Sequence, residues 1–138
     1  LRRAPARARG GPDAKGGLAM NFPQTARRIV ARIQRRLPAE LRAAAQEVPV
    51  CIEDWPDEDL VADGLSPDIL GLFVGAPRHQ HDSDPGPPPQ ILLYLENILD
   101  ECEEAGTSFE EEVRRTYLHE LGHYLGLDED ALADRDLD

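Results

Sequence analysis

The sequence predicts a single α+β domain, in which a helix near each end of the chain flanks short β-strands. Three observations favour this class: apolar residues recur at helical spacing in two segments, β-prone runs lie between them, and 138 residues suffice for one modest core. Hydrophobic residues make up 41% of the chain and charged residues 30%, and no apolar run approaches the roughly 20 residues that cross a bilayer. Neither a membrane-spanning nor a wholly disordered chain is expected.

Charge is distributed unevenly along the chain. The formal net charge is −12, yet residues 1–42 carry 11 basic and 2 acidic residues, whereas residues 43–138 carry 4 and 25. The acidic body should repel nucleic acid. The arginines between residues 27 and 42 are expected to form a solvated helix face whose charge is opposite to that of the acidic body. No motif that reads a nucleic-acid groove accompanies them.

Residues 1–19 are expected to be a disordered extension, and residues 20–138 to be the folded domain. The extension is rich in Arg and Gly and lacks the apolar stretch of a secretory signal, and Met20, the sole methionine, stands just before the first amphipathic pattern. The two cysteines, Cys51 and Cys102, form no C-x-x-C pair. Structural thiols in a reducing compartment, the cytoplasm by default, are therefore expected.

The first predicted element is an amphipathic helix that begins near Thr25. Its apolar residues recur at helical spacing with arginines between them: Ala26, Ile29, Val30, Ile33, Leu37 and Leu41. Pro38 has no backbone N–H to donate, so it either begins a second short helix over 38–46 or kinks the first.

Three β-prone runs follow, at 48–52, 69–74 and 90–95. The segment 76–89 between the second and third runs contains five prolines and is expected to be an irregular loop. The acidic cluster at 57–59 is expected to be a solvated turn.

The last helix has the clearest start and stop signals. Ser108 and Glu111 form a capping box, and the glutamates of the first turn are favoured by the helix dipole. Gly126 can adopt the left-handed conformation that ends a helix. These signals predict a helix over about 108–125.

The pattern H-E-x-x-H, formed by His119, Glu120 and His123, lies inside this last helix. Residues four apart lie about 40° apart around a helix, so both imidazoles can reach one ion. Zinc takes such ligands at about 2.0–2.1 Å, and Glu120 would lie beside the metal, where it can take a proton from bound water. The apolar residues cluster on the opposite arc of the helical wheel, so the histidines are expected outside the core-facing stripe. The alternative is a polar helix face whose histidines carry no metal.

A third ligand is needed, because catalytic zinc usually takes three protein ligands. In the spacing H-E-x-x-H-x-x-G-x-x-H, the last position corresponds to Glu129, and Gly126 would turn the chain so that Glu129 points back at the metal. Asp128 and Asp130 flank Glu129 and remain alternatives.

Other polar and aromatic residues are weaker candidates for the site. His79 and His81 could add a ligand, but in a Pro-rich acidic loop a solvated surface pair is favoured. Tyr94 is a candidate to stabilise an oxyanion, whereas the wheel positions of Tyr117 and Tyr124 indicate core aromatics.

Together these features resemble the small bacterial zincin-like metallopeptidases, a single-domain family with the motif H-E-x-G-H-x-x-G-x-x-[DE]. The resemblance covers about residues 25–132 and extends beyond the motif to the runs 37–40, 48–55, 69–75 and 90–95. It implies a minimal zincin-like fold, with a backing helix, a small mixed sheet of three or four strands and an active-site helix. It also implies Zn²⁺ held by His119, His123 and Glu129, with Glu120 as the general base. Glu129 stands where many members have Asp.

The leading functional hypothesis is a zinc-dependent metallopeptidase that acts on short or unfolded peptides. The alternative is a metal-binding interaction module with little activity of its own, whose cleft is completed by a protein partner. A third hypothesis, a nucleic-acid-binding regulator that uses residues 1–42, is less favoured, and no membrane partner is expected.

Overall fold

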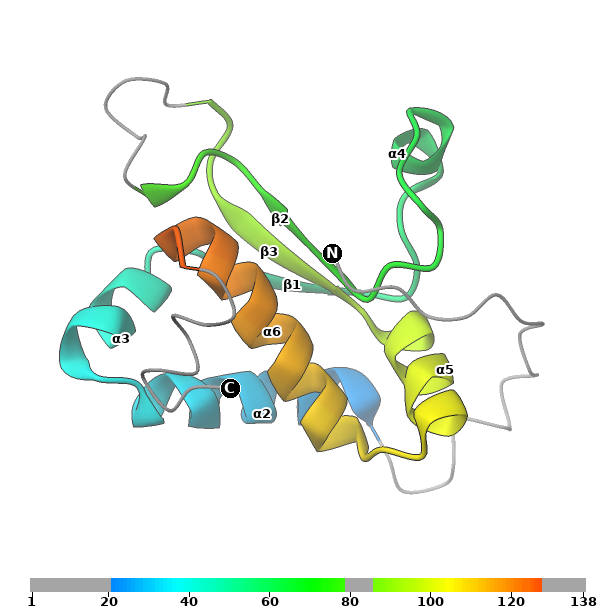
Figure 1. Ribbon diagram of the computed structural model, residues 1–138, viewed down its shortest axis with the longest axis horizontal. Coiled ribbons are helices and arrows are strands. Elements are labelled where there is room, and N and C mark those ends of the chain that lie inside the picture. The colour runs from blue at the N-terminus through cyan, green and yellow to red at the C-terminus, as the bar shows by residue number, and fades with distance from the viewer. Residues whose placement is uncertain (1–20, 79–85, 128–138) are drawn as a thin grey trace.

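The computed structural model describes residues 21–78 and 86–127 and confirms an α+β domain. In chain order, its described elements are α2 (Phe22–Arg36), α3 (Ala39–Ala45), β1 (Val50–Glu53), α4 (Glu58–Ala62), β2 (Gly71–Val74), β3 (Gln90–Tyr94), α5 (Leu95–Ala105) and α6 (Phe109–Leu125). Helix α6 runs diagonally through the molecule, with the sheet on one side and α2 on another, and α5 lies beside its first half (Figure 1).

Helix α2 begins and ends where the sequence chemistry dictates. The side chain of Asn21 caps it by accepting a hydrogen bond from the Gln24 amide at 3.1 Å. At the other end Leu37 is extended, with φ −70° and ψ 149°, because a residue before proline is disfavoured in the helical region. Pro38 then precedes the first residue of α3. The proline therefore begins a second short helix, the first of the two predicted alternatives.

Three strands form a mixed sheet in the order β1-β3-β2. Strand β1 pairs in parallel with β3, with Val50 opposite Ile91, and β2 pairs antiparallel with β3, with Gly71 opposite Leu93. The central strand buries Ile91 and Leu93 completely. The three predicted runs thus become the three strands, and the mixed sheet agrees with the fold that the family resemblance implies.

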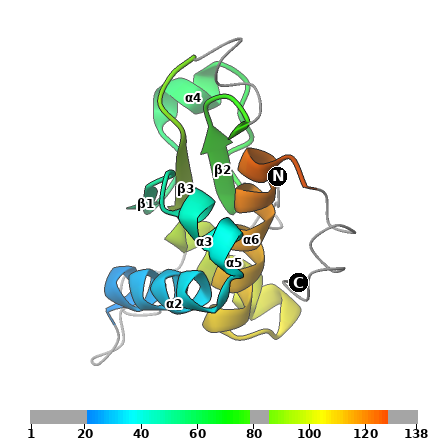
Figure 2. The same cartoon turned by 90° about the vertical axis from the view of Figure 1, so that its left-hand side faces the viewer.

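Helix α6 is the centre of the core, since it packs against β2, β3, α2 and α5 (Figure 2). Its buried side chains include Val113, Tyr117, Leu121 and Tyr124. The Tyr117 hydroxyl accepts a hydrogen bond from Gln34 Nε2 at 3.0 Å, which satisfies the phenol at the border of the core. Tyr117 and Tyr124 are therefore core aromatics, as the wheel predicts.

Helix α5 was not predicted, and it follows β3 without any intervening loop. Its first residue, Leu95, belongs to the β-prone run that was predicted as a strand, and no side chain caps it. Tertiary contacts specify this helix instead. Leu95 and Ile98 are buried, and Asn97 Nδ2 donates to the main-chain oxygens of Pro67 and Ile69 at 2.9 and 2.8 Å.

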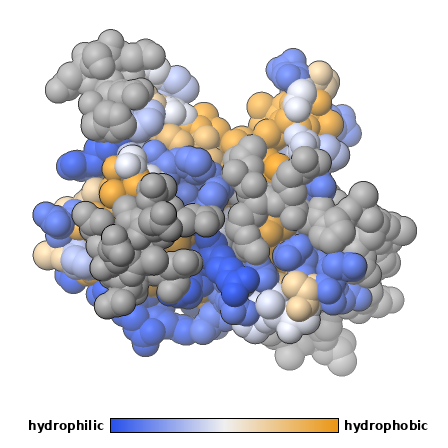
Figure 3. All heavy atoms as spheres, in the orientation of Figure 1, coloured by the Kyte–Doolittle hydropathy of each residue, from blue (hydrophilic) through white to orange (hydrophobic). Residues whose placement is uncertain are grey.

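Residues 57–59 are exposed, as the predicted solvated turn requires, but the prediction of a turn is wrong because these residues begin helix α4. The Asp57 side chain caps this helix by accepting from the Asp59 amide at 2.8 Å. Apolar residues reach the surface here, with Trp55 46% and Leu60 37% exposed, and apolar patches are visible on α4 and over the strands (Figure 3). No described helix has the length and apolar content to cross a bilayer.

Gly71 controls how closely α6 approaches β2. A Cβ at this position would lie 2.6 Å from Thr116 Cγ2 and 3.1 Å from the Leu92 carbonyl oxygen. We expect Gly71→Ala to lower the free energy of unfolding by about 1–3 kcal/mol, because the core must shift to admit the methyl group. Urea denaturation measures this loss.

The control is the double variant Gly71→Ala/Thr116→Ser, which removes the methyl group that the new Cβ meets. It should recover much of the lost stability relative to Thr116→Ser alone. An unchanged stability of Gly71→Ala would show that the contact between α6 and β2 is loose.

Candidate metal centre

Helix α6 has the ends that the sequence predicts. The Ser108 side chain accepts from the Glu111 amide at 3.1 Å, and Gly126 ends the helix in the left-handed conformation with φ 74°. The Leu127 amide donates to the Gly122 carbonyl at 2.8 Å, which closes the last turn. The chain therefore reverses at Gly126, immediately after the H-E-x-x-H pattern.

The two histidines of this pattern face each other on the surface side of α6. Their Nε2 atoms lie 3.3 Å apart and their rings are inclined by 87°. Two nitrogen ligands of a tetrahedral zinc ion, each at about 2.0–2.1 Å from the metal, lie about 3.3–3.4 Å apart. The spacing of His119 and His123 thus fits a shared metal ion. Partial desolvation also lowers the pKa of His123, although the residue stays exposed to solvent, and the lower pKa favours the neutral imidazole that binds metals.

Glu120 completes the cluster from the buried side of the helix. Its ligand atoms and those of the two histidines all lie within 4.8 Å of one another. The side chain is fully buried, and neither carboxylate oxygen has a hydrogen-bond partner within 21–78 and 86–127. Burial raises the pKa of Glu120 to about 7, and the nearby main chain of Phe73 opposes that shift. A buried carboxylate without a partner is costly, so its place beside two imidazoles fits a site that holds a cation and a water molecule.

An unpaired strand edge runs past Glu120. The Tyr94 amide donates to the Leu70 carbonyl at 2.9 Å, and antiparallel pairing alternates inward and outward main-chain groups. The peptide groups of Gly71 and Phe73 therefore face away from β3, and β2 pairs with no other strand in the part of the chain that the structure describes. A Cβ on Gly71 would lie only 3.4 Å from Glu120 Cγ, so this edge borders the carboxylate.

The histidine side of α6 is more buried than the wheel indicates. His123 is exposed and His119 is half-buried, as expected outside the core stripe. Glu112 and Thr116 share that side, yet both are completely buried, and Glu112 Oε2 accepts from the Thr107 hydroxyl at 2.6 Å. The unpredicted helix α5 and the approach of β2 enclose this side, so only a tertiary contact could have revealed its burial.

A polar clamp next to the histidines was also missed. The Tyr124 hydroxyl donates to Glu47 Oε1 at 2.6 Å, and Arg78 donates to both oxygens of the same carboxylate at 2.8 and 3.2 Å. The clamp joins the end of α6 to the segments before β1 and after β2. Its members are 31 to 77 residues apart in the sequence, and no local pattern indicates such a contact.

Several predicted site residues fall outside the described residues: Asp128, Glu129, Asp130, His79 and His81. The third ligand therefore stays a prediction, and so does the interpretation of the two loop histidines. The described part of the site consists of His119, Glu120 and His123.

Tyr94, the predicted oxyanion candidate, lies at the end of β3. It is buried, and its hydroxyl has no hydrogen-bond partner among the described residues. Burial raises the pKa of this phenol to about 12, and the carboxylates of Glu53, Asp57 and Glu120 add to the shift. A neutral phenol is the form that can donate a hydrogen bond, but its catalytic role stays a prediction.

Comparison with known proteins gives one family match. The model of a family described as zincin-like metallopeptidase matches residues 45–138, which include all three strands and α6. Among solved structures, the chain is similar to a conserved hypothetical protein from Thermo thermophilus, with 26% sequence identity and a TM-score of 0.49. The similarity covers 83% of this chain and 99% of the other. No curated protein matches the chain.

The predicted roles differ between the two histidines, as zinc ligands, and Glu120, as the base. We expect His119→Ala and His123→Ala to abolish stoichiometric zinc binding, because each removes one of two facing nitrogens. Glu120→Gln should retain zinc, and so should the control Glu111→Gln, which changes a half-buried carboxylate on the same helix that pairs with Arg115. Zinc titration against a competing chromophoric chelator measures each affinity. Equal zinc loss in the histidine and Glu120 variants would contradict this division of roles.

The clamp should contribute measurably to stability. Tyr124→Phe removes the hydroxyl that donates to Glu47, and we expect the free energy of unfolding to fall by about 1–2 kcal/mol. Tyr117→Phe removes a hydrogen bond between uncharged groups and should cost less. Urea denaturation of both variants tests the order, and a larger loss for Tyr117→Phe would show that the clamp is not a stabilising contact.

Proposed function

The chain belongs to the zincin-like metallopeptidase family, whose model covers more than half of it, and from this premise we propose that it is a zinc-dependent peptidase acting on extended or unfolded peptides. The observation that carries the proposal is the pair of imidazole nitrogens 3.3 Å apart beside a buried carboxylate that lacks a hydrogen-bond partner among the described residues. Two ligands and a free base at one end of a helix are the parts that metal-assisted hydrolysis needs.

The chain's own residues divide the chemical work between them. His119 and His123 would hold the zinc ion, with the third ligand predicted among Glu129, Asp128 and Asp130. The bound ion would supply Lewis acidity, which polarises the scissile carbonyl and acidifies a water molecule. The Glu120 carboxylate accepts a proton from the attacking water and delivers it to the nitrogen of the leaving amine. Its burial keeps bulk water away from these transfers.

The edge of β2 supports a peptide as the substrate. The outward peptide groups of Gly71 and Phe73 can pair with an extended chain, which would add a strand to the sheet next to Glu120. Such pairing uses main-chain groups, so it depends little on side-chain sequence. It also requires that the substrate be extended, which favours unfolded segments over folded proteins.

The same edge supports a second candidate function, a metal-binding interaction module. A strand of a partner protein could add to β2 and remain uncleaved, with the metal serving to organise the surface. Both candidates would bind the metal, but only the first would cleave the peptide that pairs with β2.

The test compares zinc-loaded wild-type protein with Glu120→Gln on reduced, unfolded casein. We expect fragments from the wild type and from the control Glu111→Gln, and a rate lower by about 100-fold or more for Glu120→Gln with zinc retained. Fragment formation is followed by mass spectrometry. Stoichiometric zinc in the wild type without any cleavage would contradict the peptidase proposal and favour the interaction module.

A further inference from the structure

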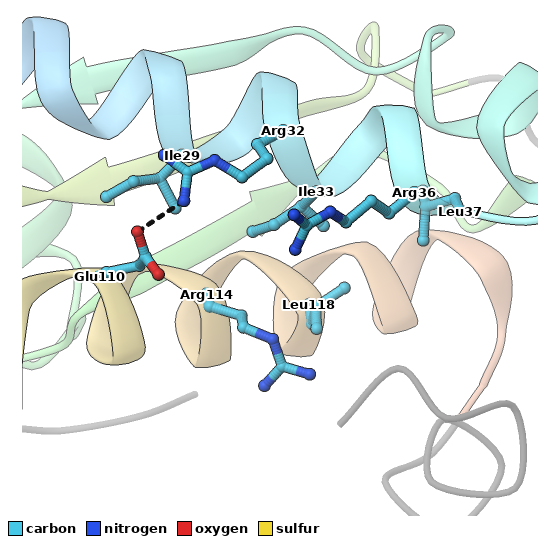
Figure 4. A pocket seen from close by; sticks show the side chains of 8 residues that line it. All are labelled: Ile29, Arg32, Ile33, Arg36, Leu37, Glu110, Arg114 and Leu118. Atoms are coloured by element: carbon cyan, nitrogen blue, oxygen red, sulfur yellow. Dashed lines mark hydrogen bonds and ion pairs between the residues drawn. The ribbon is translucent and has the colours of Figure 1, made fainter.

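A groove of about 240 Å³ lies between α2 and α6, away from the metal centre (Figure 4). Its apolar lining comes from Ile29, Ile33, Leu37 and Leu118, and its charged lining comes from Arg32, Arg36, Arg114 and Glu110. On α6, the lining residues repeat every four positions and lie on a side of the helix distinct from that of His119 and His123. The groove is therefore separate from the proposed active site.

The charge of the groove is opposite to that of the protein. Three arginines and one glutamate line the groove, and Arg32 Nη1 pairs with Glu110 Oε1 at 2.7 Å. Helix α2 contains five arginines and no acidic residue, whereas the whole chain has a net charge of −12. A basic rim over apolar side chains is complementary to a ligand that is both acidic and apolar.

We propose that residues 132–138 of this same chain dock in the α2–α6 groove. This segment carries three acidic residues and one arginine, together with Leu132 and Leu137, and it follows the acidic residues 128–130. Its acidic side chains match the arginine rim, and its leucines match the apolar lining. The segment thus has both properties that the groove requires.

The length of the segment permits this docking. Leu118 precedes Leu127 by nine residues, a rise of roughly 13 Å along the helix at 1.5 Å per residue. An extended chain covers roughly 3.3 Å per residue, so about four residues return to the level of Leu118 and the remainder can lie over the groove. Attachment to α6 also gives the segment an effective concentration in the millimolar range, which favours it over a free acidic peptide of similar composition.

Docking would also restrain the residues that approach the metal. The predicted third ligand, Glu129, and its neighbours Asp128 and Asp130 lie between the end of α6 and the docking residues. This consequence rests on the proposed zinc site. It implies that the groove arginines contribute to zinc affinity without touching the ion.

Amide hydrogen exchange of the full-length chain tests the docking directly. In the wild type, amides of residues 132–138 should exchange at least about tenfold more slowly than in a free peptide of residues 128–138. The groove variant Arg36→Glu/Arg114→Glu should lose this protection. The matched control Arg27→Glu/Arg35→Glu, which reverses two arginines of α2 outside the groove, should keep it. Absence of protection in the wild type, or equal loss in both variants, would overturn the proposal.

A charge swap excludes a general effect of the substitutions on folding. Adding Asp134→Arg/Asp136→Arg to the groove variant should restore the protection, because the opposite charges then face each other again. Lack of restoration, with the same thermal midpoint as the groove variant, would overturn the charge pairing and with it the docking.

Zinc titration of the same proteins separates this inference from the proposed function. We expect about fivefold or greater loss of zinc affinity in the groove variant and none in the control. Loss of exchange protection with unchanged zinc affinity would support the docking and overturn its coupling to the metal. Absence of zinc binding by the wild type would overturn the metal centre, while the exchange measurement would still decide whether the segment docks.

Discussion

The close contact between α6 and β2 is the constraint on which the site depends. Gly71 has no side chain, and its backbone lies against Thr116 and Glu120 with no room for a Cβ. This contact sets the Glu120 carboxylate below an unpaired strand edge and leaves the two histidines on the outer side of the helix. A larger residue at Gly71 would separate Glu120, the proposed general base, from the unpaired edge of β2. The packing of one helix on one strand thus determines both the burial of Glu120 and its distance from that edge.

Helix α6 buries the polar side chains of Glu112, Thr116 and Glu120, and its buried polar groups differ in how they are compensated. Glu112 accepts a hydrogen bond from Thr107, and Tyr124 donates to Glu47 in a clamp that Arg78 completes. Glu120 has no such bond within the described residues, although burial of an ionised carboxylate is unfavourable. Glu120 is the less compensated of the two buried carboxylates of α6, and it is the one that the proposed reaction uses. The free-energy cost of burying the Glu120 carboxylate is offset by the surrounding contacts of α6 with the sheet, α2 and α5.

The helical repeat of α6 places its residues on three sides with different surroundings. One side packs in the core, one presents the histidines, and one forms the basic groove with α2. Helix α2 packs on α6, so Arg32 and Arg36 line the groove between the two helices. The arginine face of α2, which the sequence predicts to be a solvated surface, therefore also lines part of a groove. Only the position of α2 against α6 distinguishes these two interpretations.

Features that depend on neighbouring residues could be predicted from the sequence. Helix α6 with its Ser108 cap and Gly126 stop, the three strands, and the facing of His119 and His123 all follow from local chemistry and helical spacing. Features that depend on contacts between distant residues could not be predicted from local patterns. Helix α5 forms from a β-prone start because its apolar residues and Asn97 find partners in the core and in the segment before β2. Burial of Glu120 beneath β2 and the clamp at Glu47 likewise require segments that approach only after folding, since burial is a property of the packed chain and not of a residue's immediate neighbours.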